Sequence, residues 1–110
     1  MLTSKELAAQ GVVMTPLFVG DGCSFLYQIP AGKRIGQHAH KLGHSSMLLL
    51  GTALIRDDAG IRKLTAPATV FLPADVAHEV EGVTDILWAC TWSDAQGLID
   101  AEDFARAVTA

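Results

Sequence analysis

Hydrophobic and polar residues alternate in short stretches along this chain, and the alternation predicts β-strands rather than helices. In residues 23–29, for example, Phe25, Tyr27 and Ile29 fall on one face of an extended chain, and the residues between them fall on the other. Residues 78–82 alternate in the same way, which places Glu79 and Glu81 together on the face opposite to position 78. Stretches of this kind are typical of strands with one buried face.

Glycine, proline and aspartate separate these stretches at short intervals, as turns between strands do. Pro16 cannot donate a ladder hydrogen bond, so the first stretch suits an edge strand, and Gly51 divides the central stretch into two short strands or one bulged strand. Helices are expected only near the two ends, from Thr3 or Ser4 to Gln10 and from Asp100 to Val108. About eight short strands are expected, in residues 12–19, 23–29, 45–56 (counted as two), 61–66, 69–72, 78–82 and 84–92. The fold class predicted is all-β: a small antiparallel β-barrel or double-sheet jelly roll with short N-terminal and C-terminal helices.

Length and composition narrow the classes of protein that fit. The chain has 110 residues, 50% of them hydrophobic and 18% charged, so we expect one folded domain over residues 1–110 and no disorder. The formal net charge is −4, and the only basic clusters are the pairs at 33–34 and 62–63, which argues against nucleic acid as a partner. No apolar run is long enough to span a membrane, and the N-terminal residues do not resemble a secretory signal. We therefore expect a cytoplasmic protein with no membrane partner.

All four histidines of the chain lie in two segments, with His38, His40 and His44 in the first and His78 in the second. Histidines two residues apart would lie about 200° apart around a helix, but they share a face on a strand. His44 keeps the same parity if the chain stays extended, and glycines at 36 and 43 allow the backbone to bend toward the site. Four imidazoles converging from two strands are a ligand set for one divalent transition metal: Zn, Fe, Ni, Cu or Mn. We predict one metal site per chain, held by these four residues.

Other catalytic residues are scarce, and none is predicted beyond the metal ligands. By parity with His44 we expect Ser46, Leu48 and Leu50 to face inward and to form an apolar pocket with one hydroxyl group. Tyr27 would either reach this pocket as a hydrogen-bond donor or pack against a strand face. Glu79 and Glu81 are expected to be solvated rather than catalytic.

The cysteines and tryptophans are expected to have packing roles. Two cysteines make no disulfide framework, so Cys23 and Cys90 are interpreted as small buried hydrophobic residues. Trp88 and Trp92 share a parity with Cys90, which favours core or dimer packing over a wall that stacks on substrate. An exposed apolar face, formed by Phe25 and Tyr27 or by the tryptophan strand, would suit a homodimer.

The residues from Gly32 to Gly82 resemble the two sequence motifs of the cupin superfamily. Gly32, His38, His40, His44 and Gly51 fall on the spacing of the first cupin motif, with His44 in the position of the motif's glutamate. Pro73 and His78 match the second motif, whereas Asp75 replaces its middle glycine and Pro67 and Gly82 stand where its first glycine and its asparagine would be. The resemblance implies a small β-barrel with a metal inside, held by the motif histidines over a core of residues 32–82, and commonly a homodimer. The histidine at position 44 is similar to the small bacterial cupins with an all-histidine site, and it separates this chain from oxalate-degrading and acireductone-type members.

The charge and the open positions of a four-histidine metal site favour oxidative chemistry at the ion. An ion bound by four neutral imidazoles keeps its full positive charge, and a six-coordinate ion would keep two positions open for a bidentate substrate, or for one substrate atom and dioxygen. The first hypothesis is therefore a dioxygenase-like oxidoreductase that uses Fe or Mn. The alternatives are a metal-dependent isomerase or cyclase, in which the ion stabilises an enolate, and a non-catalytic sensor that binds metal or a small molecule. A closed tetrahedral zinc site would instead be structural.

Overall fold

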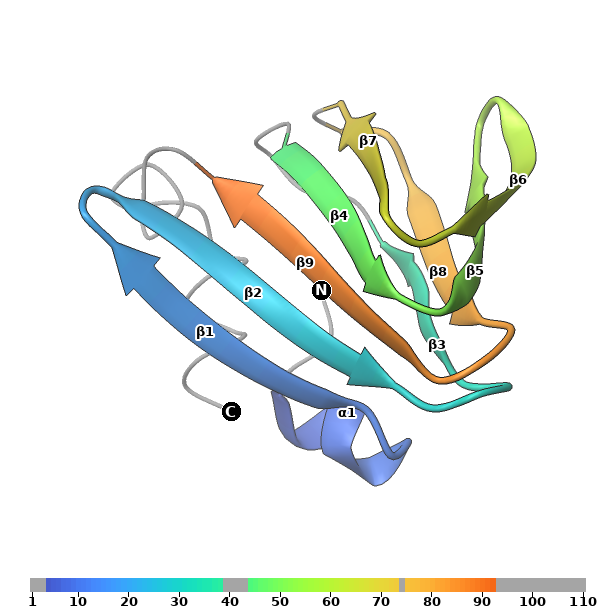
Figure 1. Cartoon of the computed structure of the whole chain (residues 1–110), viewed down its shortest axis with the longest axis horizontal. Helices are drawn as coiled ribbons and strands as arrows, with labels where there is room; N and C mark the ends of the chain where they lie inside the picture. The colour runs from blue at the N-terminus through green and yellow to red at the C-terminus, as the bar shows by residue number, and fades with distance from the viewer. Residues whose placement is uncertain (1–3, 39–43, 74, 93–110) are drawn as a thin grey trace.

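Two antiparallel β-sheets pack face to face, and one short helix, α1 (Ser4–Ala9), precedes them (Figure 1). The computed structural model describes residues 4–38, 44–73 and 75–92. One sheet has five strands in the order β1-β2-β9-β4-β7, and the other has four in the order β3-β8-β5-β6. The strands are β1 (Val13–Val19), β2 (Gly22–Ile29), β3 (Arg34–His38), β4 (His44–Leu50), β5 (Thr52–Asp57), β6 (Gly60–Thr65), β7 (Ala68–Leu72), β8 (His78–Gly82) and β9 (Ile86–Trp92). This is the predicted all-β jelly roll; the helix expected at 100–108 lies outside the described residues.

Local sequence signals explain most of the strand boundaries. β1, which contains Pro16, lies at the edge of its sheet as predicted, because only β2 pairs with it. Gly51 separates β4 from β5, so residues 45–56 form two short strands, the first of the two alternatives predicted for them. The β5–β6 turn is closed by Asp57, whose carboxylate accepts a hydrogen bond from the Ala59 amide at 2.9 Å and pairs with Arg62 at 2.8 Å.

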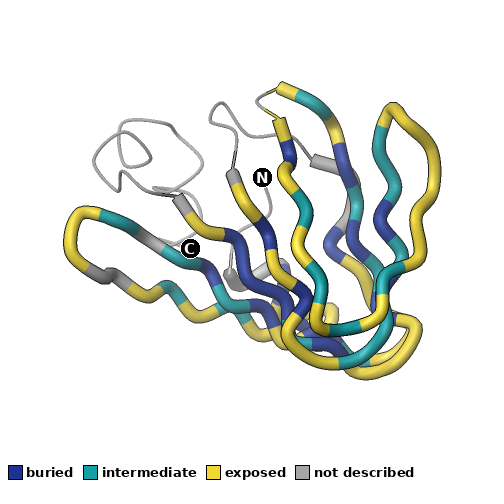
Figure 2. The backbone as a smooth tube through the Cα atoms, turned by 45° about the horizontal axis from the view of Figure 1, so that its top comes forward, coloured by how far each residue is buried: buried dark blue, intermediate teal, exposed yellow. Residues whose placement is uncertain are grey.

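The core lies between the two sheets, where alternate residues of strands such as β2, β5, β8 and β9 are buried (Figure 2). Phe25 and Tyr27 are both buried there, with ring centroids 6.5 Å apart in an edge-to-face arrangement. Phe25 and Tyr27 therefore do not form the exposed face that would have suited a dimer: their face of β2 is the one that the opposite sheet covers. Trp88 and Cys90 on β9 are buried beside them, which confirms their packing role, whereas the side chains of Trp92 and Cys23 lie outside what the structure describes.

A β-bulge in β4 overturns one expected inward position. Leu48 lies opposite Trp88 on β9, but Leu50 lies opposite Leu87, so β4 contains one more residue than β9 over this interval. The extra residue reverses the parity of the strand. As a result Ser46 and Leu48 are buried as predicted, whereas Leu50 is 63% exposed.

The outer face of the four-stranded sheet is a ladder of charges. Glu79 and Glu81 on β8 point outward as predicted, but they bind arginines rather than water alone. Glu79 pairs with Arg34 at 3.1 Å and with Arg56 at 3.2 Å, and Arg56 also reaches Glu81 at 3.2 Å. The ladder joins β3, β8 and β5 across the sheet. Among the described residues, no helix has the length and apolar character needed to cross a membrane.

Candidate metal centre

His78 is the histidine whose side chain the structure describes, and its environment fits a metal ligand. It begins β8 on the inner face of the sheet and is 1% exposed. Its Nδ1 lies 3.0 Å from the carbonyl oxygen of Val76, and a carbonyl only accepts, so the ring proton belongs on Nδ1. In the neutral ring the lone pair is then on Nε2, the tautomer in which histidines commonly bind metals.

Burial also favours the neutral, ligating form of His78. Desolvation lowers the pKa of the imidazole, and this outweighs the opposing effects of the hydrogen bond to Val76 and the charge of Asp57. A neutral imidazole is needed because a protonated ring has no lone pair to offer a metal ion. The local fold therefore holds His78 in both the tautomer and the protonation state that coordination requires.

The backbone register places His38 opposite His78. The two residues are paired across β3 and β8, and residues that face each other in an antiparallel pair share one face of the sheet, with Cβ atoms about 5 Å apart. The register shifts between Ile35 and His38, because three steps along β3 match only two along β8. Without this bulge, His38 would lie on the opposite face to the buried Ile35. The extra residue in β3, beside Gly36, returns position 38 to the inner face.

His44 belongs to the facing sheet. It is the first residue of β4, opposite Leu72, and it shares the parity of Ser46 and Leu48, which are both buried. The segment from Leu72 to His78 is a short connection from β7 in one sheet to β8 in the other. The start of β4, which pairs with the end of β7, therefore lies at the same end of the fold as the start of β8 (Figure 1).

The remaining predicted ligand, His40, lies outside the described residues, and His38 and His44 are described by their backbone alone. Among the side chains that the structure describes, no three His, Cys, Asp or Glu groups come together. The fold thus brings positions 38 and 78 together on one sheet and position 44 onto the other at the same end. The complete four-histidine set stays a prediction.

Ser46, Cys90 and Trp88 form a buried polar network that the sequence did not indicate. The Cys90 thiol accepts hydrogen bonds from the Ser46 hydroxyl at 3.5 Å and from the Trp88 indole N–H at 3.2 Å. Burial raises the pKa of Cys90 to about 11, although both hydrogen bonds oppose the rise. The thiol is therefore protonated at neutral pH, and the one hydroxyl expected in the pocket is engaged with sulfur. Parity alone gave these residues a common face, but only the register of β4 against β9 makes Ser46 and Cys90 partners.

The backbone conformation explains why glycine occupies two positions of the first motif. Gly32 and Gly51 have positive φ angles of 80° and 84°. Asp75, which replaces the motif's middle glycine, also has a positive φ of 61°, a conformation that aspartate tolerates better than most residues. The sequence therefore departs from the motif at position 75 while the backbone keeps a conformation that glycine would favour.

Comparison with known proteins identifies the fold. No family model matches the chain, and no curated protein sequence matches it. Its structure is similar to an RmlC-like cupin from Shewanella frigidimarina, with 24% identity, 82% of each chain covered and a TM-score of 0.71. It is also similar to a Cupin 2 conserved barrel domain protein from Salinispora arenicola, with 20% identity over 83% of this chain and 82% of that one and a TM-score of 0.68.

A third similar structure is KdgF from a Halomonas species, with 14% identity, 74% of this chain and 78% of that chain covered and a TM-score of 0.66. At these identities the similarity concerns the fold. The chain has the cupin fold, as the motif resemblance implied.

Proposed function

We propose that this protein binds one divalent transition metal through His38, His40, His44 and His78 and acts on a small organic substrate. The observation that carries the proposal is the pairing of His38 with His78, a buried neutral imidazole whose Nδ1–H is held by the Val76 carbonyl. The start of β4 brings position 44 to the same end of the fold from the other sheet. An all-histidine donor set accepts Fe, Mn, Ni, Zn or Cu, and Fe or Mn suits the reaction proposed next.

The reaction that fits best is a dioxygenase-like oxidation. Beyond the proposed ligands, the described inward residues supply no acid–base pair: Cys90 is protonated, the Ser46 hydroxyl donates to its sulfur, and Tyr27 packs against Phe25. The neighbouring inner surface is apolar, with Leu48, Leu72 and Val80 buried. A redox-active ion would supply the activation of substrate and dioxygen that these side chains lack. The residues of the chain would hold the ion, orient an apolar substrate and exclude water. A cytoplasmic location is part of the same proposal.

Metal content is the first test. The untagged protein is purified anaerobically without chelator and analysed by elemental mass spectrometry beside His44→Ala and Ser45→Ala. Ser45 is the matched control, because it is the exposed neighbour of His44 on β4. We expect about one Fe or Mn per chain in the wild type and in Ser45→Ala, and weakened binding in His44→Ala, since loss of a ligand lowers metal affinity. A wild type that stays metal-free after reconstitution refutes the proposed site.

The reaction class is tested separately by oxygen uptake. The metal-loaded protein is screened against diketones, catechols and alkenyl phenols, with His44→Ala as the inactive control. No oxygen consumption across this panel would refute the oxidative proposal. Activity with Zn that is indifferent to dioxygen would assign the isomerase or cyclase alternative. Metal binding with no turnover of any kind would favour a sensor.

A further inference from the structure

An acidic side chain lies beside His78 on the inner face of the four-stranded sheet. The register of β5 against β8 pairs Arg56 with Glu79, so the next step along both strands places Asp57 beside His78. The charge of Asp57 accordingly acts on the His78 imidazole. His38 pairs with His78 from β3, and β8 lies between β3 and β5 in the sheet. Asp57 therefore flanks His78 on the side opposite to His38.

Asp57 holds the guanidinium group of Arg62 on this inner face. Asp57 shares the inward parity of Ile55, and only 9% of its side chain is exposed. Arg62 lies opposite Ile55 on β6, so it belongs to the same face. Its Nη2 donates to Oδ2 of Asp57 at 2.8 Å, while Oδ1 accepts from the Ala59 amide at 2.9 Å. Both carboxylate oxygens are thus engaged, and they fix the guanidinium in place.

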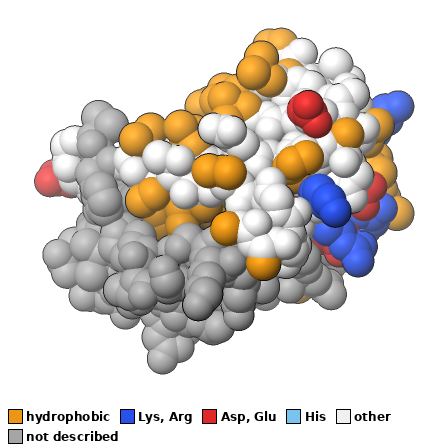
Figure 3. All heavy atoms as spheres, turned by 90° about the horizontal axis from the view of Figure 1, so that it is seen from below, with side chains coloured by type: hydrophobic (Ala, Val, Ile, Leu, Met, Phe, Trp, Pro, Cys, Tyr) orange, Lys and Arg blue, Asp and Glu red, His pale blue; other side chains and the backbone are white. Residues whose placement is uncertain are grey.

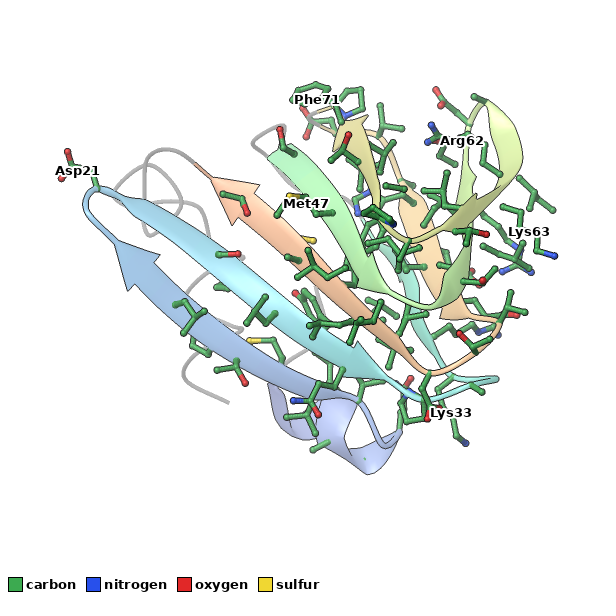
Figure 4. All side chains as sticks on the ribbon, in the orientation of Figure 1. Asp21, Lys33, Met47, Arg62, Lys63 and Phe71 are labelled. Atoms are coloured by element: carbon green, nitrogen blue, oxygen red, sulfur yellow. The ribbon has the colours of Figure 1, made fainter. Side chains whose placement is uncertain are left out.

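Arg62 differs in its position from the other basic residues on the described strands of this sheet. Arg34 and Arg56 form the ion pairs of the outer charge ladder, and Figure 3 shows basic side chains beside acidic ones at one side of the molecule. Lys63, the neighbour of Arg62 on β6, has the outward parity. In Figure 4, Arg62 lies on the side of the β5–β6 hairpin toward β8, whereas Lys63 points away from it. Among these residues, the cation on the inner face is Arg62.

The guanidinium of Arg62 has hydrogen-bonding capacity left for a ligand. It has five N–H donors, and the partner that it has among the described residues is Asp57. Because 43% of its side chain is exposed, a solute can reach the remaining donors. The planar fork of an arginine binds a carboxylate through two parallel hydrogen bonds. Arginine stays protonated, so this group binds an anion rather than transferring a proton.

We propose that Arg62 binds the carboxylate of the substrate, which makes the substrate a small organic acid; this inference rests on the proposed function. The chain has a formal net charge of −4 and would repel an anion elsewhere, so a fixed cation beside the metal site favours its binding there. The apolar body of the acid packs against the buried surface of Leu48, Leu72 and Val80. Arg62 thus selects the substrate by charge, and the apolar surface selects it by shape.

Calorimetric titration of the metal-loaded protein with matched catechols tests the proposal. The probes are the two dihydroxybenzoates with adjacent hydroxyl groups, their methyl esters and catechol itself. All of them carry the same pair of hydroxyl groups to bind a metal, and only the two acids carry a carboxylate. We expect the wild type to bind at least one acid about tenfold or more tightly than its ester, because a charged hydrogen-bonded pair replaces a neutral contact.

Substitutions on β6 assign the preference to Arg62. Arg62→Gln should weaken binding of the acid by about tenfold or more and leave binding of the ester unchanged. Lys63→Gln is the matched control, because it removes the same charge from the neighbouring residue with the opposite parity. Arg62→Lys keeps a cation for Asp57 but not the planar fork, so it should weaken binding of the acid several-fold. Thermal unfolding accompanies each variant, and Arg62→Lys decides the question if Arg62→Gln does not fold.

A wild type that binds neither acid more tightly than its ester overturns the proposal. So do equal losses for acid and ester in Arg62→Gln, an equal loss in Lys63→Gln, or, where Arg62→Gln does not fold, an unchanged affinity in Arg62→Lys.

Metal content of the same samples separates this test from that of the proposed function. A protein that holds metal but shows no preference for acids refutes the role of Arg62 alone. A protein that takes up no metal refutes the metal site. Benzoate and methyl benzoate are then titrated into the metal-free chain: a preference for benzoate that Arg62→Gln abolishes supports anion binding by Arg62, and no preference overturns it.

Discussion

Replacing Gly51 with alanine tests how closely the connection between β4 and β5 packs against the connection between β8 and β9. Gly51 joins β4 to β5 with a φ of 84°, and an added Cβ would overlap the carbonyl oxygen of Asp85 and lie 2.6 Å from the Thr84 hydroxyl. Neither neighbour is free to retreat. The Asp85 oxygen belongs to the backbone, and the Thr84 hydroxyl accepts from the Thr52 amide at 3.0 Å and donates to Asp85 at 3.1 Å. The substitution should therefore force this loop apart.

The cost has two parts, and a second glycine separates them. An L-residue in the left-handed region costs about 1–2 kcal/mol, and overpacking against fixed atoms costs about 1–3 kcal/mol more. Gly32 has nearly the same φ, 80°, but an added Cβ there has no atom within 4 Å, so Gly32→Ala bears only the first cost. We expect Gly32→Ala to lower the free energy of unfolding by about 1–2 kcal/mol and Gly51→Ala by about 2–5 kcal/mol.

Urea unfolding of both variants beside the wild type measures the difference. The m-value, the slope of the unfolding free energy against urea concentration, should be the same in the wild type and both variants. Both substitutions change stability rather than the surface exposed on unfolding. Gly51 lies at the far end of β4 from His44, so metal content should be unchanged in both variants. Equal losses in the two variants would refute the reasoning, since the approach of Asp85 and Thr84 would then contribute nothing.

Two further predictions concern the interior. The folded state raises the pKa of Cys90 from 9.0 to about 11, so the folded chain keeps a proton that the unfolded chain releases, and stability falls as pH rises through this window. Between pH 8 and about pH 10.5 the wild type should lose about 2 kcal/mol more than Cys90→Ala does, measured by urea unfolding at each pH; parallel losses would contradict the assigned pKa. Deletion of Gly36 should remove the β3 bulge and leave His38 opposite His78, so metal binding should survive. Deletion of Ser45, which lies in a regular part of β4 beside His44, should abolish it, and equal losses would refute the bulge.

Strand positions were predictable because their signals are local. Alternation over residues 23–29, the proline in β1 and the glycine between β4 and β5 each act through a few neighbouring residues, and the structure confirms all three. The sequence did not reveal which surface of a strand another sheet would cover. The face of Phe25 and Tyr27 was one candidate for an exposed dimer face, but the same alternation is consistent with burial, and only packing against the second sheet decides between the two.

The difference between local signals and long-range pairing also decides which face two bulged positions occupy. The bulge in β3 places position 38 opposite His78, and the bulge in β4 turns Leu50 outward. Each depends on pairing with a strand some forty residues away, in β8 or in β9, so counting parity along a single strand gives the wrong face beyond it. The resemblance of the histidine spacing to the motif was unaffected, because it rests on positions along the chain rather than on the face that each residue occupies. For Leu50 no such motif exists, and its position followed only from the register of the folded sheet.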